Sequence, residues 1–230
     1  MREIILDTET TGLDPKDGHR VIEIGALELT NMIPGANFHA YFNPERSMPS
    51  EAENIHGLSD SFLADKPLFK EQAQAFLDFI GDSPLVAHNA DFDINFLNAE
   101  FARIGHPGIS NNKIIDTVAL ARKKFPGAKA SLDALCQRFS IDTSDRSKHG
   151  ALLDAGLLAQ VYIELRGGLQ KDLGLDQDKG SDTIDDNSIA ERIYRPVRAH
   201  AATQEELERH ARFVDKIPDA IWKDYTDRVS

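Results

Sequence analysis

Three stretches near the N-terminus have the apolar and polar pattern of β-strands. They cover residues 2–9, 21–29 and 38–42, and short turns separate them. Successive side chains of a strand point to opposite faces, so alternation of this kind is typical of strands with one buried face. Because short turns connect antiparallel neighbours, we expect a hairpin-connected sheet at the start of the chain.

Farther along, apolar residues recur at helical spacing and alternate with short apolar runs. The spacing predicts helices over residues 67–80, 93–104, 131–139 and 151–165, with a proline near the start of the first. Short strand candidates lie at residues 84–87 and 113–115, and the second leads into a helix. Strands followed by alternating helices and strands predict an α/β fold, a mixed sheet with helices packed on it.

The periodic pattern weakens after residue 168. Residues 176–187 are polar, acidic and almost free of apolar side chains, a composition typical of a disordered linker. A short segment at 188–197 and a predicted helix at 203–214 follow. We therefore expect a globular domain over residues 1–168, a flexible linker over 169–187 and a C-terminal tail over 188–230.

Composition excludes several classes of protein. Hydrophobic residues make up 41% of the chain, enough for a core, but no run approaches the roughly 20 apolar residues of a membrane helix. The N-terminal apolar run is too short for a signal peptide. The single cysteine, Cys136, can form no internal disulfide, and its helical spacing from Leu132, Leu135 and Phe139 favours core packing over catalysis. These features suit a protein of the cytoplasm.

The net charge of −12 argues against binding nucleic acid by bulk electrostatics. Residues 122–148 nevertheless carry seven basic and only three acidic side chains. This segment is either an ordinary solvated face or a local basic surface. The basic residues are Arg122, Lys123, Lys124, Lys129, Arg138, Arg146 and Lys148.

The first candidate for chemistry is an acid pair at the end of the first predicted strand. Asp7 and Glu9 follow the apolar residues 4–6. Two residues apart on a strand, their carboxylates share one face and lie about 6.5 Å apart along the chain. A divalent metal would stabilise such a pair, whereas the alternative is a strand end that emerges into solvent.

The second candidate is the segment from His88 to Asp93, where a predicted strand gives way to a helix. Asp91 and Asp93 both lie near this junction. Because aspartate is a favoured helix N-cap, either of them could serve as a cap only.

The third candidate pairs His149 with Asp154. Five residues on a helix turn about 500°, so the two cannot share a helix face, and His149 reaches a site from the loop or first turn. Asp154 falls on the inward stripe formed by Leu158, Val161 and Leu165. An acid in that stripe needs a partner, and the alternative to a metal is a buried salt bridge to Arg122 or Lys148.

Together these segments supply four acids and one histidine, each at the end of an element or on an inward face. Carboxylates without a cysteine or histidine cluster favour a hard, oxygen-seeking cation, so Mg²⁺ or Mn²⁺ fits better than zinc. Two such ions about 4 Å apart can hold the attacking and leaving oxygens of a phosphodiester displacement.

The order and separation of these segments resemble the three motifs of the DnaQ-like, or DEDDh, exonuclease superfamily. The resemblance covers residues 2–168 and implies an RNase H-like fold and 3′→5′ exonuclease activity. The motifs are residues 7–12 (DTETTG), 88–93 (HNADFD) and 149–154 (HGALLD).

The resemblance also implies a role for each motif residue. Asp7, Glu9 and Asp154 would be direct metal ligands that also lie against the substrate, with Asp7 bridging both ions. Asp93 would support the second ion partly through water, and His149 would be the general base that deprotonates the attacking water. Asp91 is an extra acid that the motif does not require.

Residues 50–57 resemble the segment that contacts the terminal nucleotide in the polymerase-linked branch of the superfamily. Glu51 and His56 are therefore candidate substrate contacts, and the backbone of residues 10–12 would approach the terminal base. The alternative for His56 is a plain turn histidine beside Gly57.

Residues 121–127 (ARKKFPG) and 131–139 (SLDALCQRF), with the segments after residue 168, resemble the branch formed by the epsilon proofreading subunits of bacterial DNA polymerase III. This resemblance implies partners: the polymerase alpha subunit, a sliding clamp and a small theta-like subunit. Gln170, Leu173 and Leu175 resemble a clamp-binding peptide, for which the alternative is the end of the preceding helix. Trp222 would anchor a polymerase-binding tail, for which the alternative is a tail folded back on its own domain.

The resemblance therefore predicts a bacterial cytoplasmic enzyme that removes nucleoside 5′-monophosphates from DNA 3′ ends. Tethering to a partner would raise the effective concentration of DNA and compensate for the acidic charge. Two alternatives stay open: an RNA-trimming exonuclease of the same superfamily, and a subunit that mainly stabilises its polymerase.

Overall fold

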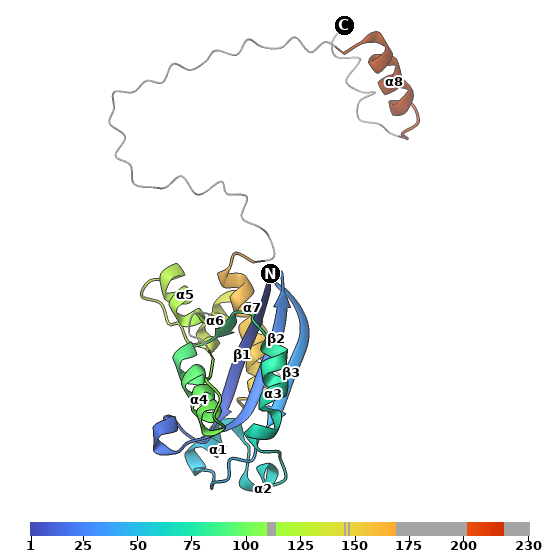
Figure 1. Ribbon diagram of the computed structural model, residues 1–230. Coiled ribbons are helices and arrows are strands. Elements are labelled where there is room, and N and C mark those ends of the chain that lie inside the picture. The colour runs from blue at the N-terminus through green and yellow to red at the C-terminus, as the bar shows by residue number, and fades with distance from the viewer. Residues whose placement is uncertain (110–113, 145, 147, 169–201, 219–230) are drawn as a thin grey trace, which may run out of the picture. The chain divides into compact units, whose positions relative to one another are not determined.

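The computed structural model describes residues 1–109, 114–144, 146, 148–168 and 202–218 of the chain (Figure 1). These belong to two units, residues 1–176 and residues 177–230, and each unit is considered separately. In the described residues, no helix is long and apolar enough to cross a membrane.

A five-stranded mixed sheet forms the centre of the first unit, as the sequence predicted. The strand order is β3-β2-β1-β4-β5; β1, β2 and β3 run antiparallel through hairpins, and β4 and β5 run parallel to β1. The strands are β1 (Arg2–Thr10), β2 (Val21–Thr30), β3 (Ile33–Tyr41), β4 (Leu85–Ala87) and β5 (Ile114–Asp116). The strand β3 begins five residues earlier than predicted. The sequence pattern missed this part because residues 33–37 are all exposed and show no alternation.

Helices cover both faces of the sheet. Figure 1 shows α3 and α4 on one side and α7 on the other, with α5 and α6 beside α7. The helices of this unit are α1 (Ser50–His56), α2 (Asp60–Leu63), α3 (Phe69–Ile80), α4 (Ala90–Arg103), α5 (Thr117–Lys124), α6 (Leu132–Phe139) and α7 (Ala151–Leu165), with a 3₁₀ turn, η1, at Pro15–Asp17.

Two predicted helix starts are wrong by a few residues. Leu68 is the N-cap of α3, so Pro67 precedes the helix instead of opening it. The helix α4 begins at Ala90, three residues before the predicted position, with Asn89 as its N-cap in the left-handed conformation. The cap interpretation of Asp91 and Asp93 is therefore wrong, because both lie inside the first turn.

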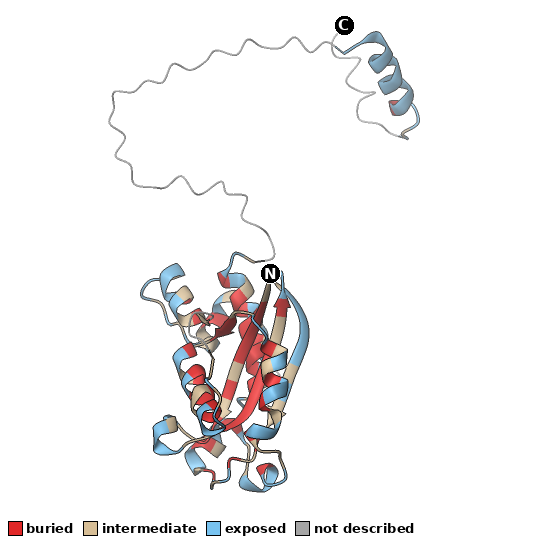
Figure 2. Ribbon diagram, in the orientation of Figure 1, coloured by how far each residue is buried: buried red, intermediate tan, exposed pale blue. Residues whose placement is uncertain are grey.

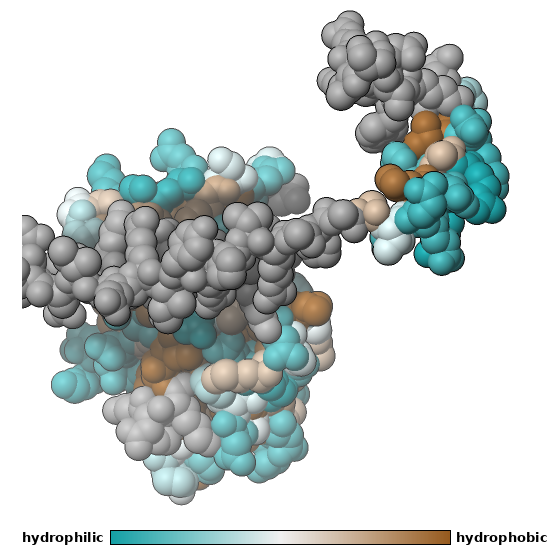
Figure 3. Space-filling model, turned by 90° about the horizontal axis from the view of Figure 1, so that it is seen from above, coloured by the Kyte–Doolittle hydropathy of each residue, from teal (hydrophilic) through white to brown (hydrophobic). Residues whose placement is uncertain are grey.

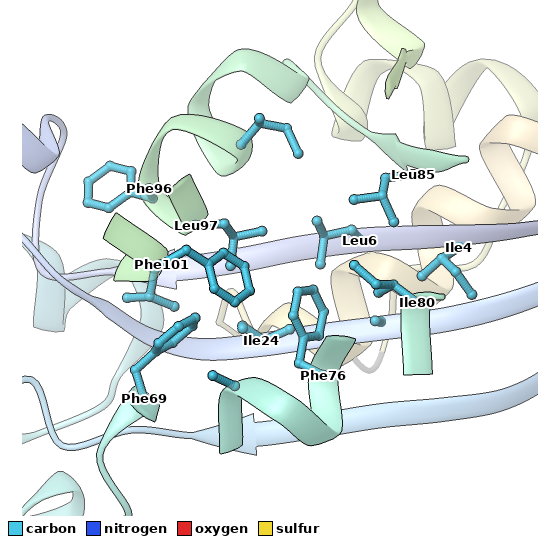
Figure 4. Close-up of a cluster of buried hydrophobic side chains, with 14 of the residues drawn as sticks. Ile4, Leu6, Ile24, Phe69, Phe76, Ile80, Leu85, Phe96, Leu97 and Phe101 are labelled. Carbon is cyan, nitrogen blue, oxygen red and sulfur yellow. The ribbon is translucent and has the colours of Figure 1, made fainter. Parts of the chain in front are cut away.

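Alternation along β1 separates two cores. Ile4 and Leu6 pack with α3 and α4, where aromatic rings of both helices lie against the sheet (Figure 4). Ile5, between them in the chain, packs on the other face against α7. Figure 2 shows the buried residues concentrated in the sheet and in the sides of the helices that face it. The residues that follow Ile5 at a spacing of two therefore face α7 as well.

Cys136 has no exposed surface and packs in a cluster between α6 and α7, which confirms the packing interpretation.

The second unit contributes one described helix, α8 (Gln204–Val214), within the predicted segment. Thr203 caps its N-terminus, and Glu206 completes a capping box. Figure 3 shows hydrophobic side chains interrupting a mostly hydrophilic surface on this unit. Leu207 and Phe213 are 52% and 64% exposed, so α8 carries apolar surface that the described residues of its unit leave uncovered.

Candidate active site

The acid pair of β1 lies on the face of the sheet that α7 covers. Asp7 and Glu9 are both half-buried and follow Ile5 at the two-residue period of the strand. Asp7 is opposite Gly25 in the register with β2, and Glu9 is opposite Glu23. The expectation that both carboxylates share one face is borne out.

The start of α7 brings the third segment to the same place. A Cβ atom on Gly25 would lie 2.2 Å from the backbone of Ala151, so only glycine lets α7 approach β2 this closely. His149 lies in the loop before α7, and its Nδ1 is 3.1 Å from Oδ2 of Asp154. Ligand atoms of Glu9, His149 and Asp154 all lie within 4.8 Å of one another.

The fourth acid comes from α4. Asp93 is 3% exposed and accepts a 2.7 Å hydrogen bond from Oγ1 of Thr8. Its charge acts on Asp7 strongly enough to shift that residue's pKa. Asp91 is exposed and lines a different cavity. The helix therefore places Asp93, and not Asp91, beside the other acids.

Burial, reinforced by electrostatic repulsion, raises the pKa values of acids in this cluster. Burial raises the pKa of Asp7 well above its usual value, and Asp93, Glu9 and Asp154 raise it further. Burial, followed by the charge of Glu23, raises the pKa of Glu9 to about 8. Burial raises the pKa of Asp93 to about 7, although its bond with Thr8 acts in the opposite direction. Such a cluster favours a cation, which would stabilise the ionised forms.

Glu23 is a fifth carboxyl group beside the site, and sequence reasoning missed it. It is 2% exposed, and its Oε1 lies 2.7 Å from Nε2 of His39 on β3. The register of the first hairpin could have revealed it, because a polar residue opposite Glu9 must share that residue's face.

The partner of Asp154 differs from both residues named as alternatives. Neither Arg122 nor Lys148 pairs with it; instead Arg146, from the loop before α7, binds both of its oxygens. Arg146 Nε lies 2.6 Å from Oδ1 of Asp154, and Nη2 donates to Oδ2 at 2.7 Å. The guanidinium also contacts the exposed Asp133. Sequence spacing could not predict the pair of Arg146 and Asp154, because Arg146 lies in a loop and no periodicity fixes where a loop side chain points.

Arg146 shares Nδ1 of His149 with Asp154. Its Nη2 lies 2.8 Å from Nδ1 of His149. Guanidinium is always a donor, so Nδ1 is the acceptor in this contact. A neutral His149 then carries its proton on Nε2, the nitrogen that would otherwise be free to accept one.

A cavity of about 550 Å³ adjoins Glu9 and contains the candidate substrate contacts. Glu51 and His56, both from α1, line it together with the backbone segment 10–12. Leu13 and Ile55, which are 85% and 55% exposed, present apolar side chains to it. Apolar walls together with several polar groups are typical of a small-ligand site.

His56 is a buried residue beside Gly57. It ends α1, is 6% exposed and accepts a hydrogen bond from the amide of Leu58 through Nδ1. Its buried Nε2 has no partner among the described residues. Burial, with help from the charges of Lys148 and His149, lowers its pKa to about 4, so the ring is neutral near pH 7 and Nε2 carries a proton to donate.

The four candidate partner-binding residues, Gln170, Leu173, Leu175 and Trp222, lie outside the described residues.

Comparisons with known proteins agree on one family. The exonuclease family RNase_T matches residues 4–162. DNA polymerase III subunit epsilon of Rickettsia conorii is 50% identical over 94% of this chain and 96% of its own length. The epsilon subunit of Escherichia coli strain K12 is 43% identical over 94% of this chain and 93% of its own.

Solved structures agree with the fold. Exonuclease X, in complex with 5′ overhanging duplex DNA, is 28% identical with a TM-score of 0.58, covering 71% of this chain and 90% of its own. The nuclease domain of 3′hExo, a DEDDh family member bound to rAMP, has a TM-score of 0.63 at 18% identity over 74% of this chain and 94% of its own, which supports the fold alone. The chain therefore belongs to the exonuclease family and, within it, to the DNA polymerase III epsilon subunits.

Proposed function

We propose that this chain is the 3′→5′ DNA exonuclease that proofreads for a bacterial DNA polymerase III, releasing nucleoside 5′-monophosphates. One observation carries the proposal: the ligand atoms of Glu9, His149 and Asp154 lie within 4.8 Å of one another, beside Asp7 and Asp93. The names of the relatives support the role in replication.

The donor set fits divalent metal ions. Asp154 Oδ1 is buried and has an ionic contact with Arg146 but no hydrogen bond from any described residue, and the carboxyl groups around it repel one another. Asp7, Glu9 and Asp154 would hold two Mg²⁺ or Mn²⁺ ions, with support from Asp93. Bound there, the ions would stabilise the negative charge of phosphodiester hydrolysis.

His149 is the proposed general base. Its side chain is 46% exposed, so water can reach it from solvent. Donation from Nδ1–H to Asp154 would orient the ring and leave Nε2 free to take a proton from the attacking water. In this tautomer Nδ1 carries a proton, so it cannot accept the hydrogen bond from Arg146. The contact between Arg146 Nη2 and Nδ1 must therefore break before His149 acts as the base.

The 550 Å³ cavity is the proposed site of the 3′-terminal nucleoside. Leu13 and Ile55 would contact the base, whereas Glu51 and the protonated Nε2 of neutral His56 would bind sugar oxygens. None of these contacts reads a base edge. Preference for errors would then follow from the easier unpairing of a mismatched 3′ end.

The remaining proposals concern partners. The tail, residues 188–230 with α8 and Trp222, would bind the polymerase alpha subunit, and the exposed Leu207 and Phe213 offer apolar contacts for it. Gln170, Leu173 and Leu175, in the proposed linker 169–187, would bind the sliding clamp. A small theta-like subunit would bind the domain 1–168, and the assembly would work in the cytoplasm.

The test is hydrolysis by a His149→Ala variant in the presence of Mg²⁺ or Mn²⁺. We expect the rate on single-stranded DNA to fall by about 10²- to 10⁴-fold. Thermal stabilisation by Mn²⁺ should persist, because the carboxylates remain. Cleavage at the wild-type rate would show that His149 is not the base.

Two further measurements separate the alternatives. DNA and RNA oligomers of equal sequence test the choice of sugar, and faster RNA cleavage would favour the RNA-trimming alternative. An Asp7→Ala, Glu9→Ala double variant with an unchanged nuclease rate would leave only a role in stabilising the polymerase.

A further inference from the structure

A second cavity, of about 750 Å³, opens on the other side of the catalytic acids. Asp7, His149 and Asp154 line one part of it. Arg122, from the last turn of α5, and Lys129, from the loop between α5 and α6, line another part. The basic segment noted in the sequence is thus partly a wall of the catalytic cleft.

Some basic side chains of this segment already have partners, whereas these two are not paired with any described residue. Arg122 and Lys129 are exposed, and neither forms an ion pair with a described residue. By contrast, Arg146 is bound to Asp154, and Lys124 donates to the carbonyl oxygens that end α7. Arg138 lies 4.5 Å above the ring of Phe125. The charges of Arg122 and Lys129 therefore remain available to a ligand.

The positions of the cavities indicate which way a bound nucleic-acid strand runs from the catalytic acids. Glu9 borders the proposed nucleoside cavity, whereas Asp7, His149 and Asp154 border the basic one, so the acids lie between the two. A third cavity nearby is lined by Asp14 and Asp91 against a single cation, Lys16. Beyond the catalytic acids, the 750 Å³ cavity is lined by Arg122, Lys129 and Arg146 against one acid, Asp133. A polyanion that leaves the catalytic acids is therefore attracted to this cavity and repelled by the acidic one.

We propose that Arg122 and Lys129 bind phosphodiester groups of the cleaved strand, upstream of the bond that is hydrolysed. The inference rests on the proposed exonuclease function, which places the terminal nucleoside in the 550 Å³ cavity. The ligand is the sugar–phosphate backbone, so the contact is independent of base sequence. It gives an acidic protein local affinity for DNA where the overall charge of −12 opposes binding.

The experiment compares substrates with and without upstream phosphates. The small substrates are the p-nitrophenyl ester of thymidine 5′-monophosphate and a dinucleotide, and the long one is a single-stranded oligonucleotide. The test protein carries Arg122→Gln and Lys129→Gln. The control carries Lys123→Gln and Lys70→Gln, which remove the same charge from exposed lysines that line neither cavity.

We expect the test protein to hydrolyse both small substrates at the wild-type rate. On the oligonucleotide its KM should rise about tenfold or more, with kcat nearly unchanged. The slope of log(kcat/KM) against log salt should become shallower by about 1.4, which corresponds to two phosphate contacts on a single strand. The control protein should match the wild type on every substrate.

Two results would overturn the inference while leaving the nuclease proposal intact. These are an unchanged KM for the oligonucleotide and an equal loss on the small substrates. Wild-type protein that hydrolyses none of the substrates would instead refute the proposed function itself.

Discussion

Gly25 of β2 lies directly against Ala151, the first residue of α7: a Cβ atom on the glycine would be 2.2 Å from the carbonyl carbon of Ala151. This contact sets how closely the first turn of α7 approaches the sheet. His149 and Asp154 flank that turn, and Asp7 is the residue opposite Gly25 on β1. One position without a side chain thus brings the acids of the strand and the helix together.

Replacing Gly25 by alanine should displace the start of α7. We expect hydrolysis to fall by about 10²-fold, because a displacement of about 1 Å at a catalytic group has that effect. The free energy of unfolding should fall by about 1–3 kcal/mol through overpacking. Steady-state kinetics and urea denaturation measure the two effects.

Gly156→Ala is the matched control within α7. A Cβ atom there meets nothing within 4 Å, and alanine is favoured over glycine inside a helix by about 1 kcal/mol. This variant should be fully active and slightly more stable. Full activity in Gly25→Ala would show that the close contact does not position the site.

The raised pKa values of the acids predict an unusual pH dependence without metal. The pKa of Glu9 is about 8 and that of Asp93 about 7, whereas unfolded carboxyl groups titrate near about 4. Between these values the folded chain binds more protons than the unfolded chain. The contribution of these groups to the free energy of unfolding is therefore greatest below about pH 4 and is lost as the pH rises through about 7 and 8.

Metal binding should reverse this trend, because the ligands must be ionised. We expect the thermal stabilisation by a fixed Mn²⁺ concentration to grow between about pH 6 and about pH 9, with release of protons. Melting temperatures with and without Mn²⁺ test this. A Glu9→Gln, Asp93→Asn variant should show a weaker dependence in both series; the same dependence as in the wild type would show that other groups cause it.

Because Arg146 pairs with Asp154, we expect it to compete with a metal ion for that carboxylate. An Arg146→Gln substitution leaves a buried carboxylate without its cation, which should lower the free energy of unfolding by about 3–5 kcal/mol in the absence of metal. Mn²⁺ should then raise the melting temperature more in this variant than in the wild type. Asp133→Asn removes only the exposed partner of Arg146 and should resemble the wild type. A smaller Mn²⁺ effect in Arg146→Gln would contradict the competition.

A hydrogen bond near the C-terminal end of α7 should contribute to stability but not to catalysis. The hydroxyl of Tyr162 donates to Oε1 of Glu3 at 2.8 Å, and both residues are buried. Tyr162→Phe should therefore cost about 1–3 kcal/mol in urea denaturation, because Glu3 loses its buried partner. Hydrolysis at low temperature should be unchanged, and a rate loss there would mean that α7 transmits the change to Asp154.

Much of the fold could be predicted because periodicity is a local property. The alternation that defines β1 also placed Asp7 and Glu9 on one face, and the inward stripe of α7 identified Asp154 as an acid in need of a partner. Exposed segments lack such a signal. The first half of β3 was therefore missed, and the start of α4 was wrong by three residues because Asn89, and not an aspartate, is its N-cap.

The sequence alone determined which residue types follow one another and which face of its own element each occupies, because backbone geometry repeats every two or about 3.6 residues. Only the tertiary structure decided which faces meet. It selected Asp93 over Asp91, placed Glu23 opposite Glu9, directed Arg146 to Asp154 and left Arg122 facing the cleft. Those outcomes depend on packing between segments far apart in the chain, and a local sequence pattern does not predict which distant segments come into contact.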